Sequence, residues 1–140
     1  YLETLDLRME RHSINAKAVA EFLDRHPGVV RVNYPGLPDH PQHDLASRQM
    51  KSHGGLMSFV VKNGIEGAAA VMNRFDLIVH AVTFGTSRTI CMHPATITHE
   101  HMTPAERAAA GIDDGLIRMS VGLEDSKDII ADLEEALDRS

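Results

Sequence analysis

The sequence predicts one α/β domain in which helices cover a small sheet of four strands. Segments with the helical spacing of apolar residues alternate with short runs rich in β-branched residues along the whole chain. A length of 140 residues, with 43% hydrophobic side chains, is sufficient for one domain with its own core. No internal repeat, linker or low-complexity tract divides the chain.

The first third of the chain is predicted to form a long helix followed by a strand. Apolar residues recur at helical spacing between charges from residue 3 to residue 25, and the His-Pro-Gly sequence at 26–28 ends this helix. Residues 29–34 alternate apolar with polar side chains, as half-buried strands do. A turn-rich loop at 35–41 and a short helical piece at 43–50 follow.

The middle of the chain is predicted to contain two further strands with a helix between them. The strands lie at 55–62 and 77–85, and the helix at 64–75 is weakened by Gly67. The next segment, 86–102, has no regular pattern and is long for a loop inside a compact domain. Because such loops are usually functional or disordered, this segment is a candidate for function.

A short helix after this loop has sequence signals at both ends. Thr103 suits the N-cap, Pro104 the first helical position and Glu106 the third, while Gly111 follows the last turn. The fourth strand is predicted at 115–121, and an acidic turn then leads into a closing helix. The apolar stripe of that helix consists of Ile129, Ile130, Leu133 and Leu137.

Arg118 lies in the middle of the last predicted strand, among apolar neighbours. A guanidinium held there requires a planar anion, for which its fork of donors is suited. Two interpretations remain open at this point. Arg118 either lies on an edge strand, pointing to solvent or pairing with Asp113 or Asp114, or it binds the carboxylate of a substrate.

The bulk composition excludes some classes of partner. A net charge of −6 argues against nucleic acid or an anionic membrane, because both require clustered Lys and Arg. No apolar run approaches the ~20 residues of a membrane span, and no signal peptide pattern opens the chain. Cys91 is the single cysteine and forms no internal disulfide, so we expect a cytoplasmic protein.

The histidines and the cysteine do not form a recognisable catalytic or metal-binding pattern. Two loops hold most of the histidines, namely His40 and His43, and His93, His99 and His101. No cysteine pair, helical HxxxH or carboxylate at ligand spacing accompanies them, so we expect no metal. We interpret Cys91 as a small core residue rather than a nucleophile, and the sequence contains no GxGxxG, Walker or GxSxG motif.

Several longer stretches occur in a characteristic order. They read LRMERHSINAKAVAEFLDRHPGVVRVNYPGLPDHPQHDLASRQM, GGLMSF, AVTFG, HPATITHEHMTPAERAAAGI and GLIRMSVGLED. From about residue 2 to its end, the chain resembles the C-terminal part of the Cys/Met metabolism enzymes that use pyridoxal phosphate. These include cystathionine γ-synthase, cystathionine and methionine γ-lyases, and homoserine-ester sulfhydrylases.

The resemblance implies that residues 1–140 form the small domain of a fold-type I enzyme, with a mostly antiparallel four-stranded sheet. In that family the matching arginine, here Arg118, binds the substrate α-carboxylate. The resemblance also places Val82, Thr83 and Phe84 near the same carboxylate, where Thr83 keeps a hydroxyl that serine supplies elsewhere. It places the loop 93–99 at the entrance of the active site, with Thr98 at the matching threonine position.

The resemblance further implies that a large cofactor-binding domain is missing from this chain. The lysine that forms the Schiff base with pyridoxal phosphate would lie upstream of Tyr1, where the chain already begins as a helix without an N-cap residue. We therefore expect no catalytic or cofactor-binding residue here, and no turnover by the 140 residues alone. In the complete protein the partners would be an amino-acid substrate, the large domain and further copies in a homotetramer.

Two departures from the family bear on the substrate. Arg88 replaces a family glutamate, and cystathionine-cleaving members often carry glutamate where this chain has Val82 and Met92. Arg88 alters the charge near the entrance loop, whereas the apolar Val82 and Met92 favour an apolar substrate tail, as in a methionine γ-lyase or a sulfhydrylase, while the leaving group stays open. An alternative from another class is a free-standing, non-catalytic α/β module that uses Arg118 to bind an amino acid or a protein.

Overall fold

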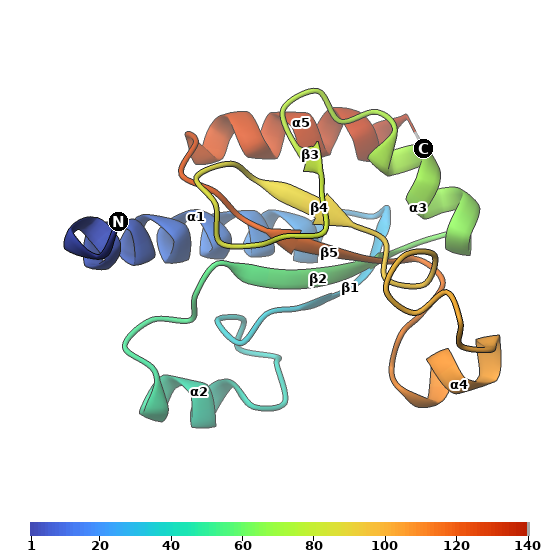
Figure 1. Cartoon of the computed structure of the whole chain (residues 1–140), viewed down its shortest axis with the longest axis horizontal. Helices are drawn as coiled ribbons and strands as arrows, with labels where there is room; N and C mark the ends of the chain where they lie inside the picture. Colours follow the sequence, from blue (N-terminus) through green and yellow to red (C-terminus); the bar gives the residue numbers. More distant parts are fainter. Residues whose placement is uncertain (140) are drawn as a thin grey trace.

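The computed structural model describes residues 1–139 and consists of one sheet with helices packed against it (Figure 1). The strands are β1 (Val29–Asn33), β2 (Leu56–Val61), β3 (Val79–His80), β4 (Ile90–Met92) and β5 (Leu116–Ser120). The helices are α1 (Leu5–Arg25), α2 (His43–Gln49), α3 (Gly64–Met72), α4 (Pro104–Ala109) and α5 (Ser126–Asp138), and a 3₁₀ turn, η1 (Leu2–Thr4), precedes α1. The predicted α/β fold class is confirmed.

The sheet has the strand order β1-β2-β5-β4-β3, so the last strand in sequence lies in the centre. The β3–β4 pair is parallel and the other pairs are antiparallel. The predicted count of four strands is wrong, because Ile90–Met92 pairs with β5 inside the segment expected to be irregular. Three buried residues show no alternation of apolar and polar side chains, so the sequence pattern does not reveal such a strand.

The predicted strand at 77–85 is also shorter than expected. Only Val79 and His80 pair with β4, and the chain then leaves the sheet as a loop at 81–89. In this loop the carbonyl groups of Val82 and Thr83 accept hydrogen bonds from Arg118 instead of a neighbouring strand. Because the Arg118 side chain satisfies these two carbonyl groups, they need no partner on a neighbouring strand. The alternating pattern of the segment therefore does not extend the pairing of β3 with β4.

The core lies between one face of the sheet and helices α1, α3 and α5. On β5 the side chains of Ile117 and Met119 point into this core and are fully buried. Because successive residues of a strand point to opposite faces, Arg118 and Ser120 belong to the other face. Helices α2 and α4 lie away from the sheet, below it at the lower left and lower right of the view (Figure 1).

Buried polar side chains of α1 hold the turn that follows β5. His12 Nδ1 lies 2.6 Å from the carbonyl oxygen of Val121. The side-chain amide of Asn15 donates to the carbonyl oxygens of Gly122 (3.0 Å) and Glu124 (2.7 Å). These contacts fix the end of the central strand against the longest helix. Within residues 1–139, no helix is both long and apolar enough to cross a membrane.

The predicted capping signals of α4 are confirmed. The hydroxyl of Thr103 accepts a hydrogen bond from the backbone N–H of Glu106, and the Glu106 carboxylate accepts one from the backbone N–H of Thr103 (2.7 Å). Hydrogen bonds with Thr103 lower the pKa of Glu106. The bond from the Thr103 backbone has the larger effect, and the bond with its side chain has the smaller one. The charged carboxylate therefore supports the start of α4.

A second carboxylate joins α5 to the segment before β3. Asp132 accepts hydrogen bonds from three consecutive backbone N–H groups, those of Asp76 (2.9 Å), Leu77 (3.0 Å) and Ile78 (2.9 Å). Three N–H groups that lack a strand partner are thus satisfied by one side chain. The carboxylate sets where the chain enters the sheet at β3.

We expect Asp132→Ala to lower the free energy of unfolding by about 2 kcal/mol, because it removes the acceptor of these charge-assisted bonds. Denaturant unfolding followed by circular dichroism measures the change. Glu134→Ala is the control, since Glu134 is exposed on the same helix. Equal stabilities of the two variants would contradict the assigned role of Asp132.

We expect Thr103→Ala to raise the pKa of Glu106 only part of the way towards its ordinary value and to weaken α4, because it removes the hydroxyl and keeps the backbone N–H that donates to Glu106. The folded-state pKa of Glu106 is lowered, so its contribution to stability is present above the unfolded-state pKa and is lost as the pH falls through the folded-state pKa. An NMR titration of the Glu106 side chain in both proteins measures the shift. An unchanged Glu106 titration in the variant would show that the Thr103 hydroxyl does not contribute to the lowered pKa.

Candidate functional site

Arg118 lies at the centre of the sheet face that the helices leave open. Its direct neighbours across the ladders are Ser58 on β2 and Met92 on β4. Its side chain is half-buried, and β5 has a strand on each side. The interpretation of Arg118 as an edge-strand residue is therefore wrong.

The guanidinium of Arg118 is held by the loop at 81–89. Its Nη2 donates to the carbonyl oxygens of Val82 (2.9 Å) and Thr83 (3.2 Å), and the group lies 5.7 Å from the centre of the Phe84 ring. Nε and Nη1 make no hydrogen bond to any of residues 1–139. Carbonyl oxygens orient the cation without neutralising it, so its charge and three donors remain available for an anion.

The acidic residues proposed as partners of Arg118 are engaged elsewhere. Asp113 pairs with Arg31 on β1 at 2.7 Å, and Asp114 pairs with Arg107 on α4 at 3.1 Å. Arg118 itself forms no ion pair within the described part of the chain. The pairing of Arg118 with Asp113 or Asp114 is therefore wrong, and its role as an anion-binding residue stays a prediction.

Tethers to β5 and to the turn after it fix the loop that orients Arg118. The backbone N–H of Gly85 donates to the hydroxyl of Ser120 (2.9 Å), which lies on the same face as Arg118. Gly85 has a φ of +76°, a conformation that favours glycine. Farther along, the backbone N–H and hydroxyl of Thr89 donate to the carboxylate of Glu124 (2.6 and 2.8 Å).

The structure brings four of the five predicted site residues together and leaves one apart. Val82 and Phe84 flank Arg118 with 57% and 61% of their surfaces exposed, and the Thr83 side chain is also exposed. Thr98 lies on the other loop, where its hydroxyl is 2.7 Å from His99 Nδ1 and 3.4 Å from the carbonyl oxygen of Pro94. No direct contact joins Thr98 to Arg118.

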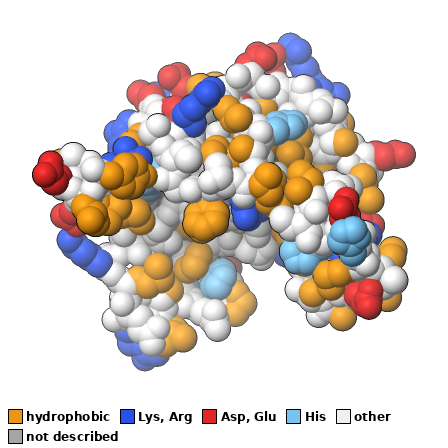
Figure 2. All heavy atoms as spheres, viewed as in Figure 1, with side chains coloured by type: hydrophobic (Ala, Val, Ile, Leu, Met, Phe, Trp, Pro, Cys, Tyr) orange, Lys and Arg blue, Asp and Glu red, His pale blue; other side chains and the backbone are white. Residues whose placement is uncertain are grey.

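An apolar groove of about 350 Å³ lies beside the Arg118 loop and was not predicted from the sequence. Its apolar lining includes Tyr1, Leu5, Met9, Met50, Leu56 and Phe84. Figure 2 shows apolar side chains gathered over the start of α1 and along the middle of this face. Because the lining comes from four separate segments, no single sequence pattern indicates the groove.

Cys91 and the histidines do not form a second reactive site. Cys91 is buried in the core, as predicted, and burial together with the charge of Asp132 raises the pKa of its thiol to about 12. Across residues 1–139, no group of three or more His, Cys, Asp or Glu side chains is arranged to hold a metal ion. The open face around Arg118 is thus the candidate functional site.

Sequence comparison identifies the class of protein to which this fold and site belong. Residues 2–138 match the family described as Cys/Met metabolism PLP-dependent enzyme. The chain therefore belongs to that family, in agreement with the resemblance noted from its motifs.

Particular relatives share both sequence and fold with the chain. L-methionine gamma-lyase of Fusobacterium nucleatum subsp. polymorphum is 50% identical over 99% of this chain and 35% of its own length. Cystathionine gamma-lyase of Dictyostelium discoideum is 45% identical over 99% of this chain and 36% of its own. The structure of cystathionine gamma synthase from Xanthomonas oryzae pv. oryzae superimposes with a TM-score of 0.92 at 43% identity, covering 99% of this chain and 36% of that one. The chain thus spans about a third of the length of its relatives.

The described residues include no buried lysine at which pyridoxal phosphate could form its Schiff base. Enzymes of this family use pyridoxal phosphate, a cofactor that requires a lysine for its Schiff base. The four lysines of the chain are all exposed, and none of them lines the apolar groove. The described residues therefore do not form a cofactor site by themselves, and we assign them no chemical step on the cofactor.

We expect Cys91 to react with iodoacetamide about a thousandfold more slowly at pH 8 than an ordinary cysteine, because the raised pKa removes the thiolate. Mass spectrometry of alkylation over time measures the rate. The same chain unfolded in guanidinium chloride is the control and should react at the ordinary rate. Fast modification of the folded chain would show that the thiol is accessible and ionised.

Proposed function

We propose that the chain is the C-terminal domain of a pyridoxal-phosphate-dependent trans-sulfuration enzyme and that it binds the α-carboxylate of the substrate. The reaction class is elimination or replacement at the γ or β carbon of sulfur amino acids or homoserine esters. The observation that carries the proposal is Arg118, a cation on the open face of a central strand with no acidic partner among residues 1–139. Membership of the family and the unpaired donors of this residue support the same role.

The geometry around Arg118 suits a carboxylate in particular. A planar guanidinium offers parallel N–H donors that match the two oxygens of a carboxylate. The carbonyl groups of Val82 and Thr83 hold the cation in place before the substrate arrives, which reduces the entropy lost on binding. We assign the exposed Thr83 hydroxyl to the same carboxylate, and Phe84 to the apolar wall beside it.

The surroundings of Arg118 favour a substrate with an apolar tail. Met92, directly opposite Arg118 on β4, is buried, and Val82 on the adjoining loop is apolar. A second charged group on the substrate would lose hydration near these side chains without gaining an ionic partner. We therefore favour an apolar thioether such as methionine, or a homoserine ester, over cystathionine. The names of several relatives, L-methionine gamma-lyases 46–50% identical to this chain, support that choice.

The remainder of the proposed enzyme lies outside this chain. We propose a large domain that carries the Schiff-base lysine, an assembly of four copies and a cytoplasmic location. Pyridoxal phosphate bound there would supply the electron sink for bond cleavage at the substrate. The role of the present chain is to orient the substrate by its carboxylate, because the cofactor acts only on a correctly aligned bond. We expect the isolated chain to be inactive, and Thr98 to border the entrance to the site.

We expect Arg118→Ala in the full-length protein to reduce kcat/KM for its amino-acid substrate by roughly 10²–10³-fold, since two charge-assisted hydrogen bonds are lost. Steady-state kinetics measures the loss. The control is Arg88→Ala, which removes an exposed cation from the same loop as Val82 and leaves Arg118 intact. Equal kinetics of the Arg118 variant and the wild type would disprove the carboxylate role. Tight amino-acid binding by the isolated 140 residues, lost in Arg118→Ala, would instead favour a free-standing binding module.

A further inference from the structure

The loop at 93–102 borders the same open face as Arg118. It begins at His93, directly after Met92, the β4 residue that lies opposite Arg118. Three consecutive side chains of this loop, Thr96, Ile97 and Thr98, are exposed. The position of the loop therefore affects the space available next to a carboxylate bound at Arg118.

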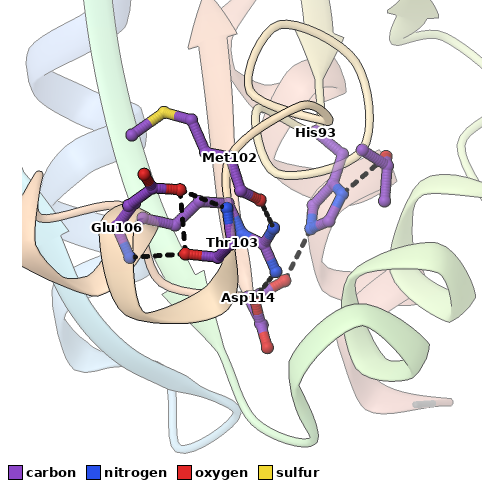
Figure 3. Close-up of polar contacts among 7 residues, drawn as sticks. His93, Met102, Thr103, Glu106 and Asp114 are labelled. Atoms are coloured by element: carbon purple, nitrogen blue, oxygen red, sulfur yellow. Dashed lines mark hydrogen bonds and ion pairs between the residues drawn. The ribbon is translucent and has the colours of Figure 1, made fainter.

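The start of the loop is fixed by a buried histidine. His93 is 6% exposed, and its Nε2 lies 2.6 Å from the carbonyl oxygen of Asp114. A carbonyl oxygen can only accept, so Nε2 carries a proton, and Nδ1 lies 2.8 Å from the hydroxyl of Thr96. Figure 3 shows the imidazole of His93 directed towards Asp114. One ring thus joins the loop to the residue that precedes β5.

The end of the loop is fixed by a buried arginine. Arg107 on α4 is 8% exposed; its Nη1 donates to the carbonyl oxygen of Met102 at 2.7 Å, and its Nη2 to the carboxylate of Asp114 at 3.1 Å. Both ends of the loop therefore meet at Asp114, which lies in the turn before β5, four residues before Arg118.

From this arrangement we propose that His93, Arg107 and Asp114 are positioning residues, named here the Asp114 cluster, that set which substrate tail the site accepts. The inference rests on the proposed function, in which Arg118 holds the carboxylate. The Asp114 cluster holds the loop 93–102 at a fixed distance from Arg118, so the loop forms a wall for the tail of the bound amino acid. The carboxylate contact and the tail wall are then controlled by different residues.

The energetics of the cluster differ from those of an ordinary surface ion pair. The Arg107 guanidinium is almost fully buried, and its Nε has no hydrogen-bond partner in residues 1–139. Burying a cation with an unsatisfied N–H costs free energy, and an apolar side chain of similar volume would pack at lower cost. What the charged group adds is a directional link from Asp114 to the loop. The neighbouring pair, Asp113 with Arg31, is half exposed on both sides and does not contact this loop.

The test uses the full-length holoprotein with Asp114→Asn and Arg107→Met, and Asp113→Asn as the matched control. Dissociation constants are measured by calorimetry for straight-chain amino acids from alanine to norleucine, which share the carboxylate and differ only in the tail. We expect both cluster variants to reduce the preference for long over short tails by at least roughly fivefold, because the wall that contacts the tail is displaced. We expect Asp113→Asn to keep the wild-type preference.

Hydrogen exchange of residues 93–102, measured without any ligand, gives a readout that does not depend on binding. We expect faster exchange there in both cluster variants and a return towards the wild-type rate in Arg107→Lys, which restores the cation. Unchanged exchange in Asp114→Asn, or faster exchange with an unchanged tail preference, would overturn the inference. Asp114→Asn keeps Arg107 in place, so it remains informative if Arg107→Met does not fold.

The same series separates this inference from the proposed function. Arg118→Ala should weaken the binding of all the amino acids by a similar factor and leave the preference for long over short tails unchanged. If Arg118→Ala does not change the binding of any of these amino acids, the proposal that Arg118 binds the carboxylate is disproved. If the cluster variants do not change the tail preference, only the role proposed for the Asp114 cluster is disproved.

Discussion

The alternation of side chains along β5 is the constraint on which both faces of the domain depend. Ile117 and Met119 are fully buried against the helices, so Arg118 between them must point to the opposite face. A shift of one residue in the pairing would place the cation in the core and a core residue outside. The burial of apolar neighbours therefore fixes the position of the guanidinium more strongly than any of its own contacts.

Carboxylates, rather than strand pairing, determine the shape of the irregular segments around this face. Glu124 accepts from Thr89, Asp132 from three backbone N–H groups before β3, and Asp114 from the arginine that holds the end of the loop 93–102. Each acceptor lies on or next to a regular element, and each donor group on or near an irregular segment. Charge-assisted hydrogen bonds thus replace the ladder that these segments lack. The loops around this face are therefore held in position by the rigid elements.

The parts of the fold with local signals could be predicted from the sequence, and the parts that depend on distant contacts could not. The long helix α1 and the capping box at Thr103 follow from spacing and cap residues a few positions apart. Strand β4 has three residues and no visible period, so only its pairing with β5 defines it. Arg118 could be singled out because a cation among apolar residues is unusual. Within residues 1–139 Arg118 has no acidic partner, and the sequence does not reveal this, because it depends on Arg31 and Arg107 reaching Asp113 and Asp114.

The exposure of the Arg118 guanidinium explains why it would bind a carboxylate more strongly within a larger protein. A half-exposed guanidinium competes with water for its anion, and an ionic contact in water contributes little free energy. Val82 and Phe84 beside it expose more than half of their surfaces, so a second surface placed over this face would bury apolar area. The same covering would lower the local dielectric around Arg118 and strengthen its hold on the carboxylate. Burial of the loop at 81–89 and affinity for the substrate would therefore increase together. Binding of the carboxylate by Arg118 would thus depend on the large domain that we propose covers this face.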